Sequence, residues 1–439
     1  MRNADMVARS LAAVWHPCTQ MKSHERFPLV PLAAAEGVWL EDFEGRRYLD
    51  GVSSWWVNLF GHGHPRIRAA IAEQLGRLEH AMLAGFTHAP AVELAERLAK
   101  LAPGALGHAF YASDGASATE IALKMAAHYW ANRGSPAKNR FVALEGGYHG
   151  ETVGALGVTD VPIFRDAYAP LLREAMVAPF PSRHVDDHHY AGVHGAHEAA
   201  RALERILADR HGQVAALILE PLVQGASGMR FYHPDYLRRA RELCDRYDVL
   251  LVADEIMTGF GRTGTMFACE QAGVAPDILC LSKGITGGFL PLSCVLCTDA
   301  IFEAFYDERV ARGFLHSHSY TGNPLACRAA CAVLDLFAEG DAIAANERKA
   351  ARFFELAQPL AHHPRIRDFR HLGMIWAFEV VTGDREFAAK AFQLALERGV
   401  LLRPIGNTVY FMPPYVIEAE QFSSLVATGL AIVDALGGA

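Results

Sequence analysis

The stretch Val249-Leu-Leu-Val-Ala-Asp-Glu255 is apolar for five residues and then acidic. Comparable apolar runs occur at Phe141–Leu144, Val214–Leu219 and Ile278–Leu281, with amphipathic helical patterns between them. Strands buried on both faces of a sheet have this composition because neither face meets water. The sequence therefore predicts an α/β fold in which a mostly parallel sheet is covered by helices.

The two ends of the chain have a different pattern. The first 64 residues indicate short strands and turns, such as the strand and turn at Gly37–Gly45. The C-terminal part alternates helical patterns with strands. We predict a large domain at residues 65–330, and a smaller α+β domain formed by residues 1–64 together with residues 331–439.

Composition and charge exclude several classes of protein. The 439 residues carry 41 basic and 49 acidic side chains, a net charge of −8, which argues against nucleic acid as a partner. No run approaches the roughly 18 apolar residues of a membrane span. The segment Met1–Trp15 lacks the apolar core of a secretory signal. We expect a cytoplasmic protein without a membrane partner.

Two segments have residues that could bind a metal. Cys294 and Cys297 have a redox or zinc spacing, but they lie in an apolar, strand-like run with no second pair at metal spacing. The segment 183–197 contains five histidines among Asp and Gly residues, without regular i,i+4 placement. We expect buried thiols in the first case and a solvated loop in the second, and no metal site.

Chemically active residues follow the apolar runs. Asp254 comes after the run at 249–253, and Lys283 comes two residues after Ile278–Leu281. The segment Ser113–Ser117 leads into a helix, and Tyr148 lies in the glycine-rich turn after Phe141–Leu144. Because parallel sheets bind ligands at the carboxyl ends of their strands, we expect these groups to meet at one edge.

This combination suits pyridoxal 5'-phosphate (PLP). The cofactor needs a lysine such as Lys283, a carboxylate such as Asp254 beside its pyridine nitrogen, and a helix N-terminus for its phosphate. Tyr148 offers a flat surface for the ring. Each residue alone has a structural explanation: a solvated lysine, a helix N-cap, a core aromatic. Their joint occurrence in this chain order predicts a PLP enzyme.

A second glycine pattern points elsewhere. Gly259-Phe-Gly-Arg-Thr-Gly264 matches the dinucleotide fingerprint G-x-G-x-x-G. That fingerprint joins a strand to a long helix, whereas Thr265 and the residues after it start a helix poorly, and Asp277 opens the next strand. We interpret the pattern as a glycine-rich turn and not as the site of a nicotinamide-dependent oxidoreductase.

Two long motifs resemble one family. Leu251–Gly264 and Pro276–Gly288 are similar to the signature of class III (ω-type) aminotransferases, which are fold type I PLP enzymes, and the resemblance extends over nearly the whole chain. It implies that Lys283 forms the Schiff base with PLP and moves the proton. It also implies that Asp254 pairs with the pyridine nitrogen and that Tyr148 lies against the cofactor. Gly115 and Ala116 would hold the phosphate through backbone N–H groups.

Shorter motifs narrow the resemblance. Val52–Trp56, Gly61–Pro65, Glu220–Arg230 and Met412–Tyr415 resemble the members that convert 8-amino-7-oxononanoate to 7,8-diaminononanoate in biotin biosynthesis, with S-adenosyl-L-methionine as amino donor. The alternatives are another ω-aminotransferase acting on lysine, a diamine or an ω-amino acid, and a non-catalytic PLP-binding protein. The lysine, acid and tyrosine of the PLP set argue against the last of these.

The resemblance also implies roles at the substrate site. Trp55 and Tyr148 would contact substrate, and Arg403 would bind a substrate carboxylate, a task that suits the two-pronged guanidinium. His318 and Ser319 match a segment that reaches the phosphate from the other subunit. The family likeness therefore predicts a homodimer with shared active sites.

The sequence departs from the family at three places. Ala116 replaces a usual serine at the phosphate, and Cys18 replaces a substrate-site tyrosine. Ser317 and His318 replace a glycine and a proline where the donor is handled. These changes leave the PLP chemistry intact but leave the amino donor open between S-adenosylmethionine and lysine or another simple amine.

Overall fold

The computed structural model describes residues 2–27, 29–181 and 192–438. The chain forms two compact units. The central unit contains residues 66–348 and 370–374, and the terminal unit contains residues 1–65, 349–369 and 375–439. The domain limits at residues 64 and 330 stay a prediction from the sequence.

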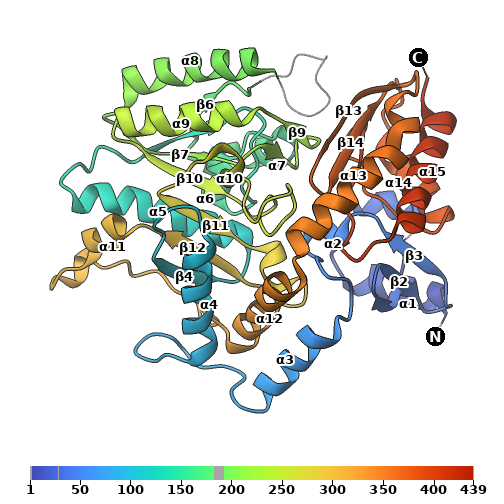
Figure 1. Cartoon of the computed structure of the whole chain (residues 1–439), viewed down its shortest axis with the longest axis horizontal. Helices are drawn as coiled ribbons and strands as arrows, with labels where there is room; N and C mark the ends of the chain where they lie inside the picture. The colour runs from blue at the N-terminus through green and yellow to red at the C-terminus, as the bar shows by residue number, and fades with distance from the viewer. Residues whose placement is uncertain (1, 28, 182–191, 439) are drawn as a thin grey trace. The chain divides into compact units, whose positions relative to one another are not determined.

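The central unit is built on a seven-stranded sheet (Figure 1) with the order β4-β12-β11-β10-β7-β5-β6. Strand β12 is antiparallel to both its neighbours, and the other neighbouring pairs are parallel. This is the mostly parallel α/β sheet that the apolar runs predict. The strands are β4 (His108–Ala112), β5 (Arg140–Leu144), β6 (Met176–Ala178), β7 (Val214–Leu219), β10 (Leu250–Asp254), β11 (Ile278–Leu281) and β12 (Ser293–Cys297).

Helices cover both faces of this sheet. Helix α5 packs against β7, β11 and β12 on one face, whereas α9 packs against β10 and α8 against β6 (Figure 1). A two-stranded ribbon, β8 (Val223–Gln224) and β9 (Arg230–Phe231), follows β7. The helices are α3 (Pro65–Leu75), α4 (Ala89–Leu101), α5 (Gly115–Asn132), α6 (Val153–Val158), α7 (Pro162–Arg165), α8 (Val193–Arg210), α9 (Pro234–Arg246), α10 (Cys269–Ala272), α11 (Asp299–Phe305) and α12 (Pro324–Gly340).

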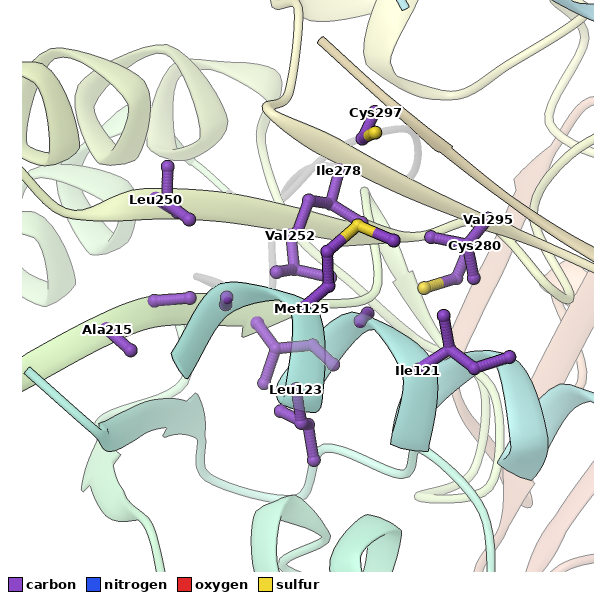
Figure 2. Close-up of a cluster of buried hydrophobic side chains, with 14 of the residues drawn as sticks. Ile121, Leu123, Met125, Ala215, Leu250, Val252, Ile278, Cys280, Val295 and Cys297 are labelled. Atoms are coloured by element: carbon purple, nitrogen blue, oxygen red, sulfur yellow. The ribbon is translucent and has the colours of Figure 1, made fainter. Parts of the chain in front are cut away.

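The core between α5 and the sheet sets the direction of the strand ends. Figure 2 shows Ile121 and Met125 of α5 against Val252 of β10 and Cys280 of β11, all of them buried. Side chains alternate along a strand, so Asp254, two residues after Val252, faces the same side of the sheet as α5. The packing of one apolar face thereby places an acid near the start of this helix.

The terminal unit combines both ends of the chain. Strand β15 pairs in parallel with β3, with Val400 opposite Leu49, and completes the sheet β1-β2-β3-β15; a second sheet has the order β13-β14-β16. The elements are α1 (Asn3–Ala13), β1 (Leu32–Glu36), β2 (Trp39–Asp42), β3 (Arg47–Asp50), α2 (Ser53–Trp56), β14 (Ile375–Val380), α14 (Phe387–Glu397), β15 (Val400–Leu401), β16 (Thr408–Phe411) and α15 (Ala419–Leu436). Helix α13 (Ala342–Ala361) and strand β13 (Ile366–Leu372) also belong here for most of their length, except for residues 342–348 and 370–372, which are part of the central unit.

The remaining motifs have plain structural places. The glycine pattern at residues 259–264 forms successive turns and is followed by the four-residue α10 instead of a long helix. Cys294 and Cys297 are buried thiols of β12. The sequence predicts a loop for the histidine-rich segment, but its residues from Val193 onward are helical, so that His194 and His197 lie on α8; His184, His188 and His189 lie outside the described residues.

Within residues 2–27, 29–181 and 192–438, no helix is both long and apolar enough to cross a membrane. The same part of the chain contains no group of three His, Cys, Asp or Glu side chains that could hold a metal ion.

Candidate active site

An acid and a histidine meet at the end of β10. Asp254 is 3% exposed, and its Oδ2 lies 2.7 Å from Nδ1 of His149. A carboxylate only accepts hydrogen bonds, so Nδ1 carries the proton and donates it to Asp254. His149 is itself fixed, because its carbonyl accepts from Thr119 Oγ1 at 2.8 Å and its N–H donates to Thr159 Oγ1 at 3.0 Å. The carboxylate is therefore held in one orientation.

The lysine follows the neighbouring strand. Lys283 opens a short 3₁₀ turn after β11, with φ at 47° in the left-handed region. The preceding Ser282 anchors the turn by donating to the Leu292 carbonyl at 2.8 Å. Burial lowers the pKa of the Lys283 ammonium, while the carboxylates of Asp254 and Glu220 act in the opposite direction. The lowered pKa increases the fraction of neutral, nucleophilic amine.

Glu220 is a third ionisable group in this cluster. It follows β7 and is 5% exposed, and its two oxygens accept from the N–H groups of Tyr148 and Gly225 at 3.0 and 2.9 Å. Burial raises its pKa to about 7; the neighbouring Asp254 charge also raises it, and His149 lowers it. The cluster thus holds one acid that changes protonation near neutral pH.

Glu220 and His149 have no predicted role in the sequence pattern. Glu220 directly follows the apolar run Val214–Leu219, so its place at a strand end is the same signal that selects Asp254. His149 is adjacent to Tyr148 in the sequence, but its partner Asp254 is 105 residues away. That pairing has no signal in the sequence pattern.

Tyr148 lies in the same loop as His149. Its hydroxyl donates to Glu151 at 2.8 Å, and its ring packs edge-on against Phe164 with the ring centres 5.3 Å apart. Its backbone N–H donates a hydrogen bond to Glu220. The tyrosine, the histidine and both buried acids therefore belong to one connected network.

The start of α5 offers free backbone donors. Asp114 caps the helix by accepting from both the N–H and the hydroxyl of Ser117, at 2.9 and 2.8 Å. The N–H groups of Gly115 and Ala116 have no hydrogen-bond acceptor among the residues that the structure describes. The positive end of the helix dipole adds to them, and such an arrangement binds phosphate.

Two close approaches place this helix end inside the cluster. A Cβ added to Gly115 would lie 3.0 Å from the side chain of Ile256, two residues after Asp254. A Cβ added to Gly150 would lie 2.5 Å from Cβ of Ala116. The start of α5 therefore contacts both the end of β10 and the Tyr148–Gly150 loop. The predicted PLP set of the central unit comes together in three dimensions.

The loop at residues 316–321 lies near this helix start in the same chain. Nε2 of His318 is 3.5 Å from Oγ of Ser113, and Nδ1 of His316 is 2.8 Å from Nζ of Lys124. Ser317 and Ser319 are exposed. The expected reach of His318 and Ser319 to a second subunit stays a prediction.

The predicted substrate residues lie in the terminal unit. The guanidinium carbon of Arg403 sits 4.6 Å from the ring centre of Trp55, which is 42% exposed. Arg403 and Cys18 both line a cavity of about 640 Å³, whose walls include Leu40 and Phe392. A cation over an aromatic face, beside a cavity whose walls are mostly but not entirely apolar, can bind a ligand that has a carboxylate and an alkyl chain.

Comparison with known proteins agrees with this geometry. A family model described as aminotransferase class-III matches residues 20–433. The chain therefore belongs to the class-III aminotransferases, has their α/β fold of PLP-dependent transferases, and is a transaminase.

Particular relatives are more specific. The adenosylmethionine-8-amino-7-oxononanoate aminotransferase of Helicobacter pylori is 43% identical, with 98% of each chain covered. The solved structure of the enzyme of that name from Methanocaldococcus jannaschii is 33% identical, with a TM-score of 0.92, and the match covers 99% of this chain and 100% of that one. An amine transaminase from an uncultivated Pseudomonas species, solved in its PLP-bound form, is 33% identical with a TM-score of 0.90 and coverage of 97% and 99%. The family and the PLP-bound relative imply PLP as the cofactor.

Proposed function

We propose that this chain is the PLP-dependent aminotransferase that converts 8-amino-7-oxononanoate to 7,8-diaminononanoate in biotin biosynthesis, with S-adenosyl-L-methionine as amino donor. Relatives that carry this activity in their names match it over nearly their whole length. The observation that carries the substrate assignment is the Arg403 guanidinium over the ring of Trp55, beside a cavity with mostly apolar walls.

The central unit suits PLP, residue by residue. The N–H groups of Gly115 and Ala116 would hold the phosphate, and Asp254 would keep the pyridine nitrogen protonated. His149 supports this role because it donates to Asp254 and fixes the orientation of the carboxylate. Bound PLP supplies an electron sink for the carbon that carries the amine. Tyr148 would cover the ring.

Lys283 is the residue that we assign to proton transfer. Burial lowers the pKa of its ammonium group, and this increases the fraction of neutral amine that can accept a proton. Its left-handed backbone turn is anchored by the Ser282 hydroxyl, which fixes the origin of the side chain. Proton abstraction from the substrate requires a base that is held in a fixed position, and Lys283 meets this requirement.

Product analysis tests the reaction. Purified enzyme with PLP, 8-amino-7-oxononanoate and a panel of donors should form 7,8-diaminononanoate. Arg403→Lys should raise KM for this acceptor by about tenfold or more, because lysine lacks the two parallel N–H groups of a guanidinium. The matched change Arg398→Lys, at the exposed end of α14, should leave KM unchanged. Weakened PLP binding with unchanged acceptor use in Arg403→Lys would contradict the assignment.

The amino donor is tested by half-reactions. S-adenosylmethionine and lysine are each mixed with the PLP form, and the loss of its visible absorbance is followed. Cys18 gives the cavity a smaller wall than the tyrosine of the family. Ser317 and His318 stand where the family has a glycine and a proline. Cys18→Tyr should then speed the reaction with S-adenosylmethionine. If lysine converts the PLP form rapidly and S-adenosylmethionine does not, lysine and not S-adenosylmethionine is the donor.

A second candidate function is a general ω-transaminase. The PLP-bound amine transaminase and an (S)-enantioselective omega-transaminase from Thermomicrobium roseum share the fold at 33% and 32% identity. Turnover of simple amines with no product from 8-amino-7-oxononanoate would favour this candidate.

We also propose a cytoplasmic homodimer in which His318 and Ser319 serve the partner's phosphate site. Mixed dimers test this proposal. When a Lys283→Ala chain pairs with a His318→Ala chain, one of the two sites should combine an intact Lys283 from the second chain with an intact His318 from the first, and that site should be active. A monomer in light scattering would contradict the proposal.

A further inference from the structure

The exposed tryptophan of the terminal unit stands on an unusual backbone. Ser53, Ser54, Trp55 and Trp56 of α2 have φ angles of 51°, 45°, 70° and 74°. Each is a non-glycine residue in the left-handed region, where Cβ crowds the following carbonyl oxygen. Such residues normally occur singly. Four in succession form a left-handed turn that needs support from the surrounding structure.

One buried carboxylate provides much of that support. Asp50 is fully buried, and its Oδ1 accepts from the N–H groups of Val52 and Ser54 at 3.2 and 3.0 Å. Its Oδ2 accepts from the Ser54 hydroxyl at 2.8 Å and from Nε2 of His62 at 2.9 Å. Three of its four hydrogen bonds are therefore with Val52 and Ser54, at the start of the turn, and the fourth is with His62, which follows the turn in the sequence.

His62 connects the carboxylate to a fixed part of the unit. Its backbone exchanges two hydrogen bonds with Gly37, at 2.7 and 2.9 Å, next to the hairpin of β1 and β2. Its ring donates to Asp50, because a carboxylate cannot donate. The position of Asp50 is thereby set by two elements of the sheet, β3 and the bridge at Gly37.

The inward side chains of the turn are also fixed. The Ser53 hydroxyl donates to the Met412 carbonyl at 2.7 Å, and Nε1 of Trp56 donates to the Tyr410 hydroxyl at 3.0 Å. Trp55 is the large side chain left pointing outward, and Arg403 stacks on it. The left-handed turn thus decides where the aromatic support of the arginine stands.

We propose that Asp50, together with His62, is a positioning residue for substrate specificity: it holds the left-handed turn that places Trp55 under Arg403. This inference rests on the proposed role of Arg403 in binding the acceptor carboxylate. An arginine already held on an aromatic face loses less side-chain freedom when a carboxylate binds. If the turn relaxes, Trp55 moves, and carboxylate binding weakens while proton transfer at Lys283 continues.

The test compares two buried aspartates of the terminal unit. Asp50→Asn keeps the shape of the side chain but replaces Oδ2, the oxygen that accepts from the Ser54 hydroxyl and from the His62 ring, by an amide nitrogen that cannot accept. Asp42→Asn is the control: Asp42 is 3% exposed and likewise accepts four bonds, including one from the Tyr48 hydroxyl at 3.1 Å, but it holds the β2–β3 turn. Both variants should lower the melting temperature.

Kinetics of the holoenzyme separate a role of Asp50 in substrate binding from a purely structural role. Asp50→Asn should raise KM for 8-amino-7-oxononanoate about tenfold and leave kcat within about threefold. Its half-reaction with 1,5-diaminopentane, a donor without a carboxylate, should stay near the wild-type rate. Trp55→Ala should reproduce this KM rise, and near-ultraviolet circular dichroism should report altered tryptophan packing in Asp50→Asn. Asp42→Asn should change neither KM nor the tryptophan signal.

The outcomes are distinguishable. An unchanged KM in a folded Asp50→Asn, with KM raised in Arg403→Lys, overturns this inference alone. An unchanged KM in Arg403→Lys overturns the carboxylate assignment and the inference with it. If Asp50→Asn does not fold, Ser54→Ala carries the test, because it removes one bond to Asp50; KM should rise about threefold, and no rise overturns the inference.

Discussion

Gly150→Ala should disrupt the proposed phosphate site through a single methyl group. The φ angle of Gly150 is 117°, and an added Cβ would lie 2.5 Å from Cβ and 2.8 Å from Cα of Ala116. Carbon atoms in contact normally lie about 3.5–4.0 Å apart, so the start of α5 or the loop after Tyr148 must move by about 1 Å. A displacement of that size can cost about 100-fold in rate, and the forced φ about 2 kcal/mol in stability.

The assay is titration of the apoenzyme with PLP, followed by visible absorbance, together with kcat and thermal melting. The control is Gly134→Ala, just beyond the other end of α5, where φ is 80° and no atom lies within 4 Å of the added Cβ. The control should lose about 1–2 kcal/mol of stability and keep PLP affinity. A folded Gly150→Ala with the wild-type Kd for PLP and unchanged kcat would refute the placement of the phosphate at this helix end.

Three further predictions concern the buried cluster. Lys283→Ala should fold, lose turnover and lose the visible absorbance of the PLP form; normal transamination would rule out Lys283 as the essential amine. Asp254→Asn should slow turnover about 100-fold or more, since a neutral amide does not favour a protonated pyridine nitrogen, and pre-steady-state rates within a few-fold of wild type would assign this role to another acid. Glu220→Gln should change the pH dependence of stability. The pKa of Glu220 is raised from 4.5 to about 7, so the folded state binds the proton more tightly; this contribution is full below pH 4.5 and falls by about 3 kcal/mol as pH rises to 7. Urea midpoints between pH 4.5 and 8 should show that loss in wild type and not in Glu220→Gln, and parallel curves would contradict it.

Local sequence patterns were enough to predict the main residues of the proposed PLP site. Apolar runs locate strands because burial on both faces excludes polar side chains, and the edge rule then selects Asp254, Lys283 and the start of α5 without knowledge of the sheet order. The sequence missed one smaller feature of the sheet. It gave no orientation for β12, which is antiparallel to both neighbours.

Pairs of residues far apart in the chain required the tertiary structure. His149 meets Asp254, and Ser53 meets Met412 across 359 residues, because separate strands and loops are brought to one place by packing. The left-handed turn of α2 is the clearest case. Nothing in Ser-Ser-Trp-Trp favours positive φ, since non-glycine residues are sterically disfavoured there. The sequence by itself predicted the residues to which we assign the chemistry. The buried bonds of Asp50, which exist only in the folded chain, decided the backbone that carries Trp55.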